Sequence, residues 1–356
     1  MKTPASLVRD EVRALSAYHV APAEGFVKLD AMENPYRLPE ELAARMGERL
    51  AGVAVNRYPD PAAPRLKQRL RETMGIPASL EIMLGNGSDE ILQLISLALA
   101  RPGAVALAPE PSFVMYRLAA IAAGMRYCGV ALNADFSLDE KSLLGAIERE
   151  RPALTWIAYP NNPTGNLFSR EAILRVIEAS PGLVVVDEAY YAFSGGASFL
   201  PQVGKHPNLV LVRTVSKLGL AGLRLGLAIG AREWVQEFEK LRMPYNVNSL
   251  SAAAAELLLE HRAVFERQTA AIVAERARLE RALDGIPGVR RFPSAANFIL
   301  ARVPDGPAAF ERLRQRGILV RTLHGSHPLL AHCLRLTVGT PDENTRMLAA
   351  LAQAPG

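Results

Sequence analysis

Lys217 is the residue of this chain whose type and position most directly suggest chemistry. It follows the apolar run Leu209–Val215 and the hydroxyl residue Ser216, and Arg224 comes shortly after it. Burial and neighbouring cations make an ammonium group lose its proton more readily, and a neutral lysine is a nucleophile that forms Schiff bases with carbonyl compounds. The alternative is a solvated lysine without a chemical role, and Lys217 alone does not decide between the two.

Other apolar runs of the chain also end in polar residues. Asp187 and Tyr190 follow the run Leu183–Val186. A carboxylate at the end of a buried strand is unfavourable unless it has a partner. A protonated heterocyclic nitrogen is one such partner, and a buried cap or ion pair is the other interpretation. The stretch Asn161–Gly165, after the run Ala153–Tyr159, indicates on its own only a turn.

The stretch Gly85–Glu90 contains a glycine-rich turn that leads directly into a helical pattern. Its residues Gly87, Ser88 and Asp89 would place free backbone N–H groups at a helix N-terminus, which is a binding site for anions. The alternative is an ordinary helix cap at Ser88. Each of these signals is weak alone, but their order and combination along one chain are a strong signal.

These residues lie at the ends of elements that the apolar pattern predicts. From about residue 81 the chain alternates strand-like and helix-like segments. Unbroken apolar strands separated by helices predict an α/β fold with a mostly parallel sheet covered on both faces, and ligands bind outside the carboxyl ends of such strands. The predicted strands are Ala104–Ala108, Arg126–Leu132, Ala153–Tyr159, Leu183–Val186, Leu209–Val215 and Arg224–Ile229, and the predicted helices are Ser88–Ala100, Pro111–Ala123, Leu138–Glu150 and Arg170–Ala179.

The last third of the chain has a different pattern. One long helix is predicted at Leu250–Leu283, and shorter elements follow it. These are the strands Phe298–Val303, Ile318–Thr322 and Leu334–Val338 and the helices Ala308–Arg316 and Glu343–Ala352. We therefore expect a large domain at residues 45–285 and a smaller α+β domain built from residues 286–356 together with an N-terminal arm, residues 1–44.

Composition narrows the class of protein further. The chain has 356 residues, 49% of them apolar, and a net charge of +5, which suits small anionic ligands. It has no basic cluster of the kind that binds nucleic acid, no membrane-length apolar run and no signal-peptide pattern, so we expect a cytoplasmic protein. Its two distant cysteines suit a reducing compartment. A group of three histidines and a cysteine at residues 324–333 fits no zinc spacing, and no metal is expected.

Several stretches together give the chain a resemblance, over nearly its whole length, to the pyridoxal-5′-phosphate-dependent aminotransferases of fold type I. Within that family it is similar to the histidinol-phosphate aminotransferases, the branch in histidine biosynthesis. The stretches are LDAMENPY (residues 29–36), RYPDP (57–61), GNGSDE (85–90), NNPTG (161–165), DEAY (187–190), SKLGLAGLRLG (216–226), ANFIL (296–300) and LRLTVGT (334–340). Where the family has Asn and Gly, this chain has Met32 and Arg37, a departure that bears on the substrate side of the site.

The resemblance implies a large domain with a mostly parallel, seven-stranded type of sheet, and it assigns roles around a pyridoxal phosphate ring. Lys217 would hold the cofactor as a Schiff base and then move a proton between the substrate and the cofactor. Asp187 would pair with the pyridine N–H and keep it protonated. Asn162 and Tyr190 would hydrogen-bond the ring oxygen, and Tyr116 would stack on the ring face.

The resemblance also implies a phosphate site and a homodimer. The groups around the cofactor phosphate would be the turn at Gly87, the backbone of Ser88 and Asp89, the Ser216 hydroxyl and the Arg224 guanidinium. Tyr58 would reach the phosphate in the neighbouring subunit, so that each active site is shared between two chains. The alternative for Tyr58 is ordinary surface packing.

The activity that the resemblance implies is amino-group transfer from L-histidinol phosphate to 2-oxoglutarate, which gives imidazole-acetol phosphate and L-glutamate. Arg335, with Asn297 near it, would bind the α-carboxylate, and Arg321 and Tyr18 are candidates for the phosphate of the donor. An aromatic amino acid aminotransferase or a threonine-phosphate decarboxylase on the same fold is the alternative. A non-catalytic regulator is disfavoured because Lys217 and its predicted partners are all present.

Overall fold

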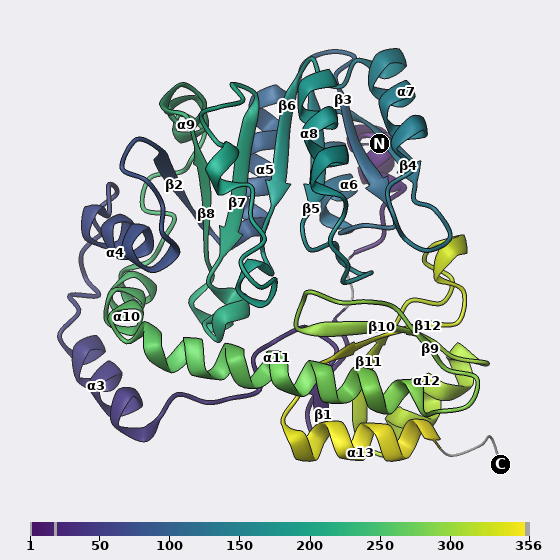
Figure 1. The fold of residues 1–356 in the computed structure, drawn as a ribbon. Helices are drawn as coiled ribbons and strands as arrows, with labels where there is room; N and C mark the ends of the chain where they lie inside the picture. Colours follow the sequence, from purple (N-terminus) through teal and green to yellow (C-terminus); the bar gives the residue numbers. More distant parts are fainter. Residues whose placement is uncertain (1, 18–19, 353–356) are drawn as a thin grey trace.

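Runs of Val, Leu, Ile and Ala form the strands of a seven-stranded sheet in the computed structural model, which describes residues 2–17 and 20–352 (Figure 1). Only β8 runs against its two neighbours, and the other pairs are parallel. The predicted α/β fold with a mostly parallel sheet is therefore confirmed. In spatial order the strands are β2 (Glu81–Asn86), β8 (Leu225–Gly230), β7 (Leu209–Thr214), β6 (Leu183–Asp187), β5 (Leu154–Ala158), β3 (Val105–Glu110) and β4 (Arg126–Ala131).

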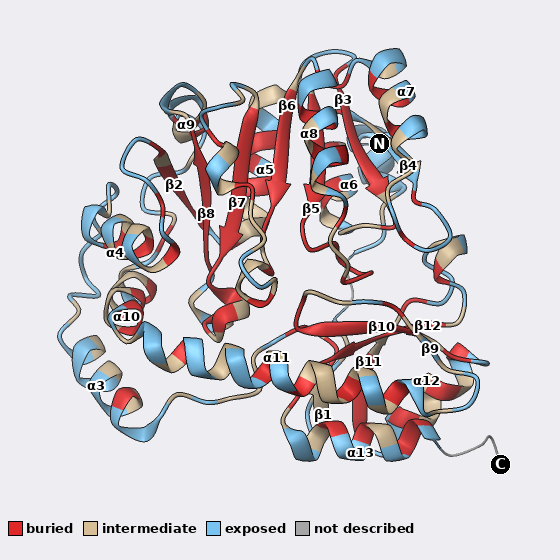
Figure 2. Ribbon diagram, viewed as in Figure 1, coloured by how far each residue is buried: buried red, intermediate tan, exposed pale blue. Residues whose placement is uncertain are grey.

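Helices cover both faces of this sheet, which is why its strands are apolar without alternation. Along β6, Leu183 and Val185 belong to one core cluster and Val184 and Val186 to another. The helices of the first cluster are α5 (Ser88–Leu99), α6 (Met115–Ala122) and α9 (Arg232–Glu239), and those of the second are α4 (Pro64–Met74), α7 (Glu140–Glu150), α8 (Arg170–Ala179) and α10 (Ser249–Glu260). Figure 2 shows the strands buried between helices that expose their outer sides.

A second, five-stranded sheet carries its own core. Its strands, in spatial order, are β1 (Val27–Leu29), β11 (Ile318–Thr322), β12 (Cys333–Thr337), β10 (Phe298–Arg302) and β9 (Arg290–Arg291). It packs against α11 (Arg262–Asp284), α12 (Gly306–Gln315) and α13 (Pro341–Ala352). The remaining helices are α1 (Pro4–Leu7), α2 (Asp10–Arg13), α3 (Glu40–Ala51) and the 3-10 turns η1 (Tyr191–Phe193), η2 (Leu200–Gln202), η3 (Ser216–Leu218), η4 (Ala221–Leu223) and η5 (Pro328–Leu330).

Two predicted helices differ from those observed. The helix expected at Leu250–Leu283 is two helices, because the backbone at His261 leaves the helical region and separates α10 from α11. Helix α10 packs on α3 and α4, whereas α11 runs along the small sheet, so the chain changes direction between them (Figure 1). The helix expected from Pro111 begins only at Met115. The division into domains at residues 44–45 and 285–286 stays a prediction.

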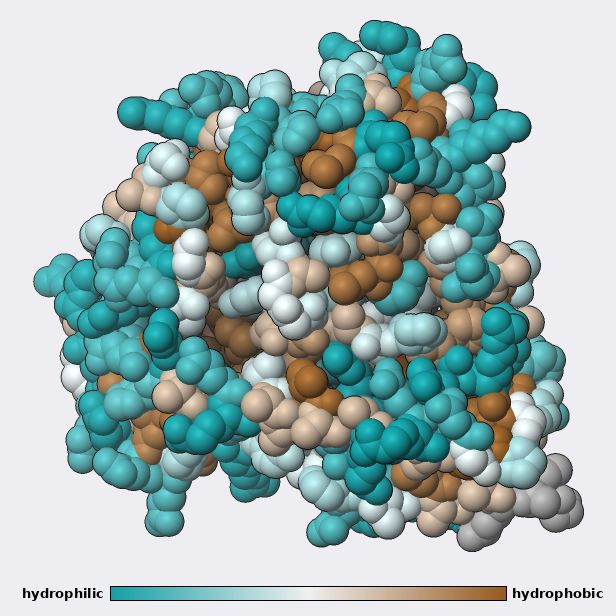
Figure 3. Space-filling model, viewed as in Figure 1, coloured by the Kyte–Doolittle hydropathy of each residue, from teal (hydrophilic) through white to brown (hydrophobic). Residues whose placement is uncertain are grey.

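The arrangement brings the ends of three parallel strands to one place. The arrows of β5, β6 and β7 point toward the second sheet in Figure 1, so the residues after these strands face the region between the two sheets. The outer surface is mainly hydrophilic on the face that Figure 3 shows. Within the described part of the chain, no helix has the length and apolar character needed to cross a membrane.

Candidate active site

A cavity at the carboxyl ends of these strands brings together nine of the residues that the sequence singled out. The space between its side chains, counted together with the solvent at its mouth, is about 620 Å³. The predicted residues that line it are Ser88, Asp89, Tyr116, Asn162, Asp187, Tyr190, Ser216, Lys217 and Arg224. The other lining residues are Met32, Phe113, Ala158, Pro160, Ala189 and Thr214. Segments far apart in sequence therefore meet in one site.

Asp187 is the last residue of β6, and its side chain is almost fully buried, with 4% of the residue exposed. It accepts hydrogen bonds from the Tyr116 hydroxyl at 2.9 Å and from the backbone N–H of Ala189 at 3.1 Å. Burial raises the pKa of Asp187 to about 6, although both hydrogen bonds act in the opposite direction. At neutral pH the carboxylate is mostly ionised, and it presents a desolvated negative charge that suits a cationic partner.

Lys217 lies in η3, directly after β7, and is partly buried. Its Nζ donates a hydrogen bond to the backbone oxygen of Ala31 at 3.2 Å. Burial, followed by the positive charge of Arg335, lowers the pKa of Lys217 to about 8. A substantial fraction of this amine is therefore neutral near pH 8, which is the state that attacks a carbonyl carbon.

The N-terminus of α5 forms the anion-binding end of the cavity. Gly87 precedes this helix with φ at +84°, and a Cβ atom there would lie 2.5 Å from Nη2 of Arg224. A Cβ atom on Gly226 would lie 2.4 Å from the backbone nitrogen of Ser88. Gly226 is therefore required for strand β8 to approach the turn, and the positive φ of Gly87 favours glycine at that position. The helix N-terminus and the guanidinium together provide N–H donors and positive charge for an anion.

Ser216 and Asp89 complete this end of the site. The Ser216 and Thr214 hydroxyls are hydrogen-bonded at 2.9 Å. Arg224 contacts the carboxylate of Asp89 at 3.3 Å, and both side chains are about half exposed, so this ion pair adds little to stability. Arg224 itself adopts a left-handed backbone conformation, with φ at +50°.

Asn162, Tyr190 and Arg335 form a hydrogen-bonded chain between the two sheets. Asn162 Nδ2 donates to the Tyr190 hydroxyl at 3.1 Å, and Nη1 of Arg335 donates to Asn162 Oδ1 at 2.7 Å. Nη2 of Arg335 donates to the backbone oxygen of Asp30 at 2.7 Å. Arg335 is thus held in a buried position beside the cavity, with its charge close to Lys217.

The structure does not support the stacking role predicted for Tyr116. Its ring is fully buried and stacks on Trp156, with ring centroids 5.2 Å apart and an angle of 2° between the planes. One face of the ring is thus covered by Trp156, and the Tyr116 hydroxyl donates a hydrogen bond to Asp187. Phe113 is the partly exposed aromatic residue that lines the cavity, and it meets the Tyr116 ring edge-on at 5.7 Å.

Two of the predicted substrate residues, Arg321 and Arg335, lie on the second sheet, and Asn297 directly precedes its strand β10. Arg321 on β11 is the direct cross-strand partner of Arg335 on β12. Residues directly opposite each other in an antiparallel pair project from the same face of the sheet, so the expectation that both arginines face one side agrees with this register. Asn297 is fully buried, and its Nδ2 donates to the backbone oxygen of Met32 at 2.9 Å. Tyr18 lies outside the described residues.

Tyr58 does not lie in the cavity of its own chain. It is 80% exposed and stacks on Tyr245, with ring centroids 4.4 Å apart. Phe113 lines the cavity although sequence reasoning gave it no role, and Met32, noted in the sequence only as a departure from the family, lines it too. Met32 has a left-handed backbone, with φ at +53°, although it is not a glycine. Met32 could be noticed in the sequence because the family has Asn at that position. No motif in the sequence pointed to Phe113.

The histidine and cysteine group at residues 324–333 forms no metal site in the described residues, where no three His, Cys, Asp or Glu side chains gather in a suitable way. His324 and His332 lie with ring centroids 4.8 Å apart, and the backbone N–H of His332 donates to His324 Nδ1 at 3.1 Å. These histidines therefore serve local loop structure.

Known proteins resemble this chain over its whole length. The family described as aminotransferase class I and II matches residues 24–351. A histidinol-phosphate aminotransferase of Chromobacterium violaceum is 54% identical over 98% of both chains, and one from Burkholderia lata is 52% identical over 100% of both chains. The crystal structure of histidinol-phosphate aminotransferase from Sinorhizobium meliloti in complex with pyridoxal-5′-phosphate is similar with a TM-score of 0.87 and 25% identity, and the match covers 98% of this chain and 97% of that one.

Proposed function

Because the chain belongs to the family of class I and II aminotransferases, we propose that it is a pyridoxal-phosphate enzyme of histidine biosynthesis. It transfers the amino group of L-histidinol phosphate to 2-oxoglutarate and gives imidazole-acetol phosphate and L-glutamate. The observation that carries this proposal is the identity of more than half of the sequence, over 98% of both chains, with a histidinol-phosphate aminotransferase.

The residues of the cavity fit pyridoxal phosphate. A buried carboxylate, Asp187, suits a pyridinium nitrogen, and the lowered pKa of Lys217 suits an amine that binds an aldehyde. Arg224 lies close to Gly87 at the N-terminus of α5, where the guanidinium and the backbone N–H groups form a cradle for a phosphate. When bound, the cofactor supplies a ring that withdraws electrons from the substrate carbon.

Each side chain of the cavity has a separate role in the proposed reaction. Lys217 would hold the cofactor through its side-chain amine, and the same Nζ would serve as the base that takes the proton from the substrate Cα. Asp187 keeps the ring nitrogen protonated, with its own charge held by Tyr116. Asn162 and Tyr190 are the candidates for the ring oxygen, and Phe113, in place of Tyr116, is the candidate for the contact with the ring face.

The pair of arginines on β11 and β12 supports recognition of anionic substrates. Arg335 is the candidate for the α-carboxylate of glutamate and 2-oxoglutarate, because Asn162 and the Asp30 carbonyl fix its guanidinium beside the cavity. Arg321, which lies opposite Arg335 in the register, is the candidate for the phosphate of histidinol phosphate. One donor and one acceptor can therefore use the same site in turn.

A screen of half-reactions tests the proposed donor. Purified enzyme loaded with pyridoxal phosphate is mixed in turn with histidinol phosphate, phenylalanine, tyrosine and threonine phosphate, and the cofactor absorbance is followed. We expect histidinol phosphate to convert the cofactor to its amine form with the highest kcat/KM, and 2-oxoglutarate to reverse the change. A higher kcat/KM for an aromatic amino acid, or release of carbon dioxide from threonine phosphate, would replace the proposed activity with one of the two alternatives.

An exposed apolar surface supports the proposal that two chains share each active site. Tyr58 and Val55 precede α4, and Met243 and Tyr245 lie in the segment after α9. All four side chains are largely exposed, between 40% and 80%, and Tyr58 stacks on Tyr245. Exposed apolar residues grouped in this way are typical of an interface. We propose that this surface contacts a second copy and that Tyr58 reaches the partner's cofactor phosphate.

Subunit mixing tests the shared site. Lys217→Ala and Tyr58→Phe subunits are each expected to form weakly active dimers. In a mixed dimer, the site with an intact Lys217 receives an intact Tyr58 from the other chain, so activity should rise above that of either parent. The matched control mixes Lys217→Ala with the double variant Lys217→Ala/Tyr58→Phe, which leaves no intact site and should show no gain. A monomer in analytical ultracentrifugation at assay concentration would refute the shared site.

The two cysteines support a cytoplasmic location. Cys333 is buried, Cys128 is partly buried, and both are free thiols. Free thiols persist where the surroundings are reducing. We therefore propose that the enzyme works in the cytoplasm, where its small-molecule substrates are made.

A further inference from the structure

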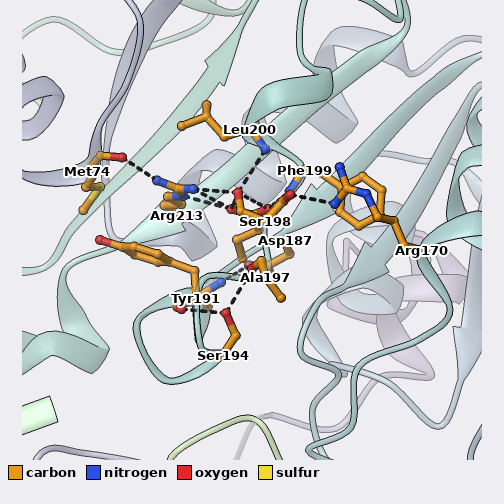
Figure 4. A network of polar contacts seen from close by, with 12 residues as sticks. Met74, Arg170, Asp187, Tyr191, Ser194, Ala197, Ser198, Phe199, Leu200 and Arg213 are labelled. Carbon is orange, nitrogen blue, oxygen red and sulfur yellow. Dashed lines mark hydrogen bonds and ion pairs between the residues drawn. The ribbon is translucent and has the colours of Figure 1, made fainter. Parts of the chain in front are cut away.

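A buried ion pair lies directly behind the cavity, on the side of the sheet away from Asp187. Glu188 follows Asp187 in the chain, and Arg213 on β7 precedes Thr214, which lines the cavity. Nε and Nη2 of Arg213 donate to Oε2 of Glu188 at 3.0 and 2.8 Å. Figure 4 shows Arg213 with its hydrogen bonds to Met74 and Ser198. The side chain of Glu188 is 0% exposed and that of Arg213 is 3% exposed. The pair is therefore shielded from solvent and its charges are not screened by salt.

Every remaining polar group of the pair also has a partner. Oε1 of Glu188 accepts from the backbone N–H of Phe199 at 2.6 Å and from the Ser198 hydroxyl at 2.9 Å. Nη1 of Arg213 donates at 3.1 Å to the backbone oxygen of Met74, which ends α4, and the guanidinium lies 4.2 Å from the centre of the Tyr191 ring. A buried pair of this kind is held firmly, and removal of one partner leaves an uncompensated charge.

The ion pair lies so close to Asp187 that its net charge affects the ionisation of the Asp187 carboxyl. Asp187 and Glu188 are consecutive carboxylates at the end of β6, and successive residues of a strand project from opposite faces. Asp187 thus faces the cavity while Glu188 faces Arg213, with the strand between them. Two adjacent buried negative charges repel each other unless a cation cancels one of them. The charge of Glu188 acts in the same direction as burial, which is the main cause that raises the pKa of Asp187.

We propose that Arg213 and Glu188 are positioning residues of the cofactor site, and that Arg213 cancels the charge of Glu188 so that Asp187 stays ionised opposite the ring nitrogen. The proposal rests on the role of Asp187 given above. The charged or titratable groups that face Asp187 are Tyr116 on α6, Asp89 on α5 and Glu188. Those that face Glu188 are Arg213, Tyr191 and Tyr159. None of the other groups supplies a cation to Glu188 at hydrogen-bond distance within the described residues.

The pH dependence of ligand binding by the cofactor-free protein tests this assignment. The probe is pyridoxine 5′-phosphate, which has the ring nitrogen and the phosphate but no aldehyde, so that Lys217 forms no bond with it. Its dissociation constant is measured by calorimetry between pH 4.5 and 9 in wild type and in the variants Glu188→Gln, Arg213→Met and Glu188→Gln/Arg213→Met. Thermal unfolding of each cofactor-free protein is recorded separately.

Binding of the probe weakens below a certain pH, and the midpoint of this loss should move in opposite directions in the two single variants. Binding weakens as Asp187 takes up a proton, so Arg213→Met should shift the midpoint up by about one pH unit and Glu188→Gln should shift it down by a similar amount. The double variant should return close to wild type. Loss of packing alone cannot produce opposite shifts. If Arg213→Met does not fold, Glu188→Gln and the double variant still decide the question.

Two results would overturn the assignment: unchanged midpoints, or shifts of both single variants in the same direction. Asp187→Asn separates this inference from the proposed function. Binding by that variant should lose the Asp187 component of its pH dependence and retain only the titrations of the ligand itself, at its phosphate, ring hydroxyl and ring nitrogen. If Asp187→Asn binds with an unaltered pH dependence, the role of Asp187 itself is wrong, whatever the ion pair does.

Discussion

Replacement of Lys217 by alanine should lower turnover of histidinol phosphate by ~10⁴-fold or more, because one side chain supplies both the covalent hold on the cofactor and the base that moves the substrate proton. The cofactor should still bind, since Asp187, Ser216 and Arg224 are untouched, but it should have no covalent bond to the protein. The measurement compares kcat of the variant with wild type and, in parallel, records the absorbance of the bound cofactor.

A surface lysine provides the matched control for this experiment. Lys205 is exposed and lies away from the cavity, so Lys205→Ala should retain wild-type turnover. Thermal unfolding of Lys217→Ala without cofactor should match or slightly exceed wild type, because the change removes a buried amine that is charged below about pH 8. Turnover of Lys217→Ala within about tenfold of wild type would remove Lys217 from the chemistry.

Replacement of Arg321 by alanine should separate the two half-reactions. A desolvated, charge-assisted contact to a phosphate is worth on the order of 2–4 kcal/mol, or roughly 30- to 1000-fold in kcat/KM. A structural ion pair at the surface would contribute at most about 1 kcal/mol to stability and nothing to catalysis. We therefore expect kcat/KM for histidinol phosphate to fall by that factor, while the glutamate half-reaction loses much less, because Arg335 serves the carboxylate.

Each half-reaction of the Arg321 variant is followed by the loss or return of cofactor absorbance. Arg314→Ala is a suitable control, because Arg314 lies on α12 in an exposed pair with Glu311 and should leave both half-reactions unchanged. Equal losses in the two half-reactions would mean that Arg321 is structural or binds both substrates. An unchanged kcat/KM in both half-reactions would mean that Arg321 does not bind the donor phosphate. That result would favour the aromatic amino acid aminotransferase.

The sequence was sufficient for six of the seven strands of the main sheet, all except β2, and for the residues that follow β6 and β7 in the site. Leu183–Val186 and Leu209–Val215 are apolar without interruption, and such runs form buried parallel strands wherever the chain places them. Because polar residues end both runs, Asp187 and Lys217 had to meet at one edge of the sheet. The register of β11 and β12, which sets Arg321 opposite Arg335, agrees with the expectation that both face one side.

Other features depend on contacts between distant segments, and the sequence could not predict them. Residues 250–283 contain no glycine or proline to mark the break at His261, which follows from the different surfaces that α10 and α11 cover. Phe113 and Tyr116 occupy the same turn, and only the position of Trp156 on β5 decides which ring is buried. The partnership of Glu188 with Arg213 likewise requires the pairing of β6 with β7.

Trapping of the cofactor on the protein tests the central claim most directly. The loaded enzyme is reduced with borohydride, digested and mapped by mass spectrometry, once without substrate and once after addition of histidinol phosphate. We expect a pyridoxyl phosphate adduct on the peptide that contains Lys217. The adduct should be lost when the donor is added first, because the donor amine would displace the lysine. An adduct on another lysine, or an adduct on Lys217 that histidinol phosphate leaves unchanged, would contradict the central claim.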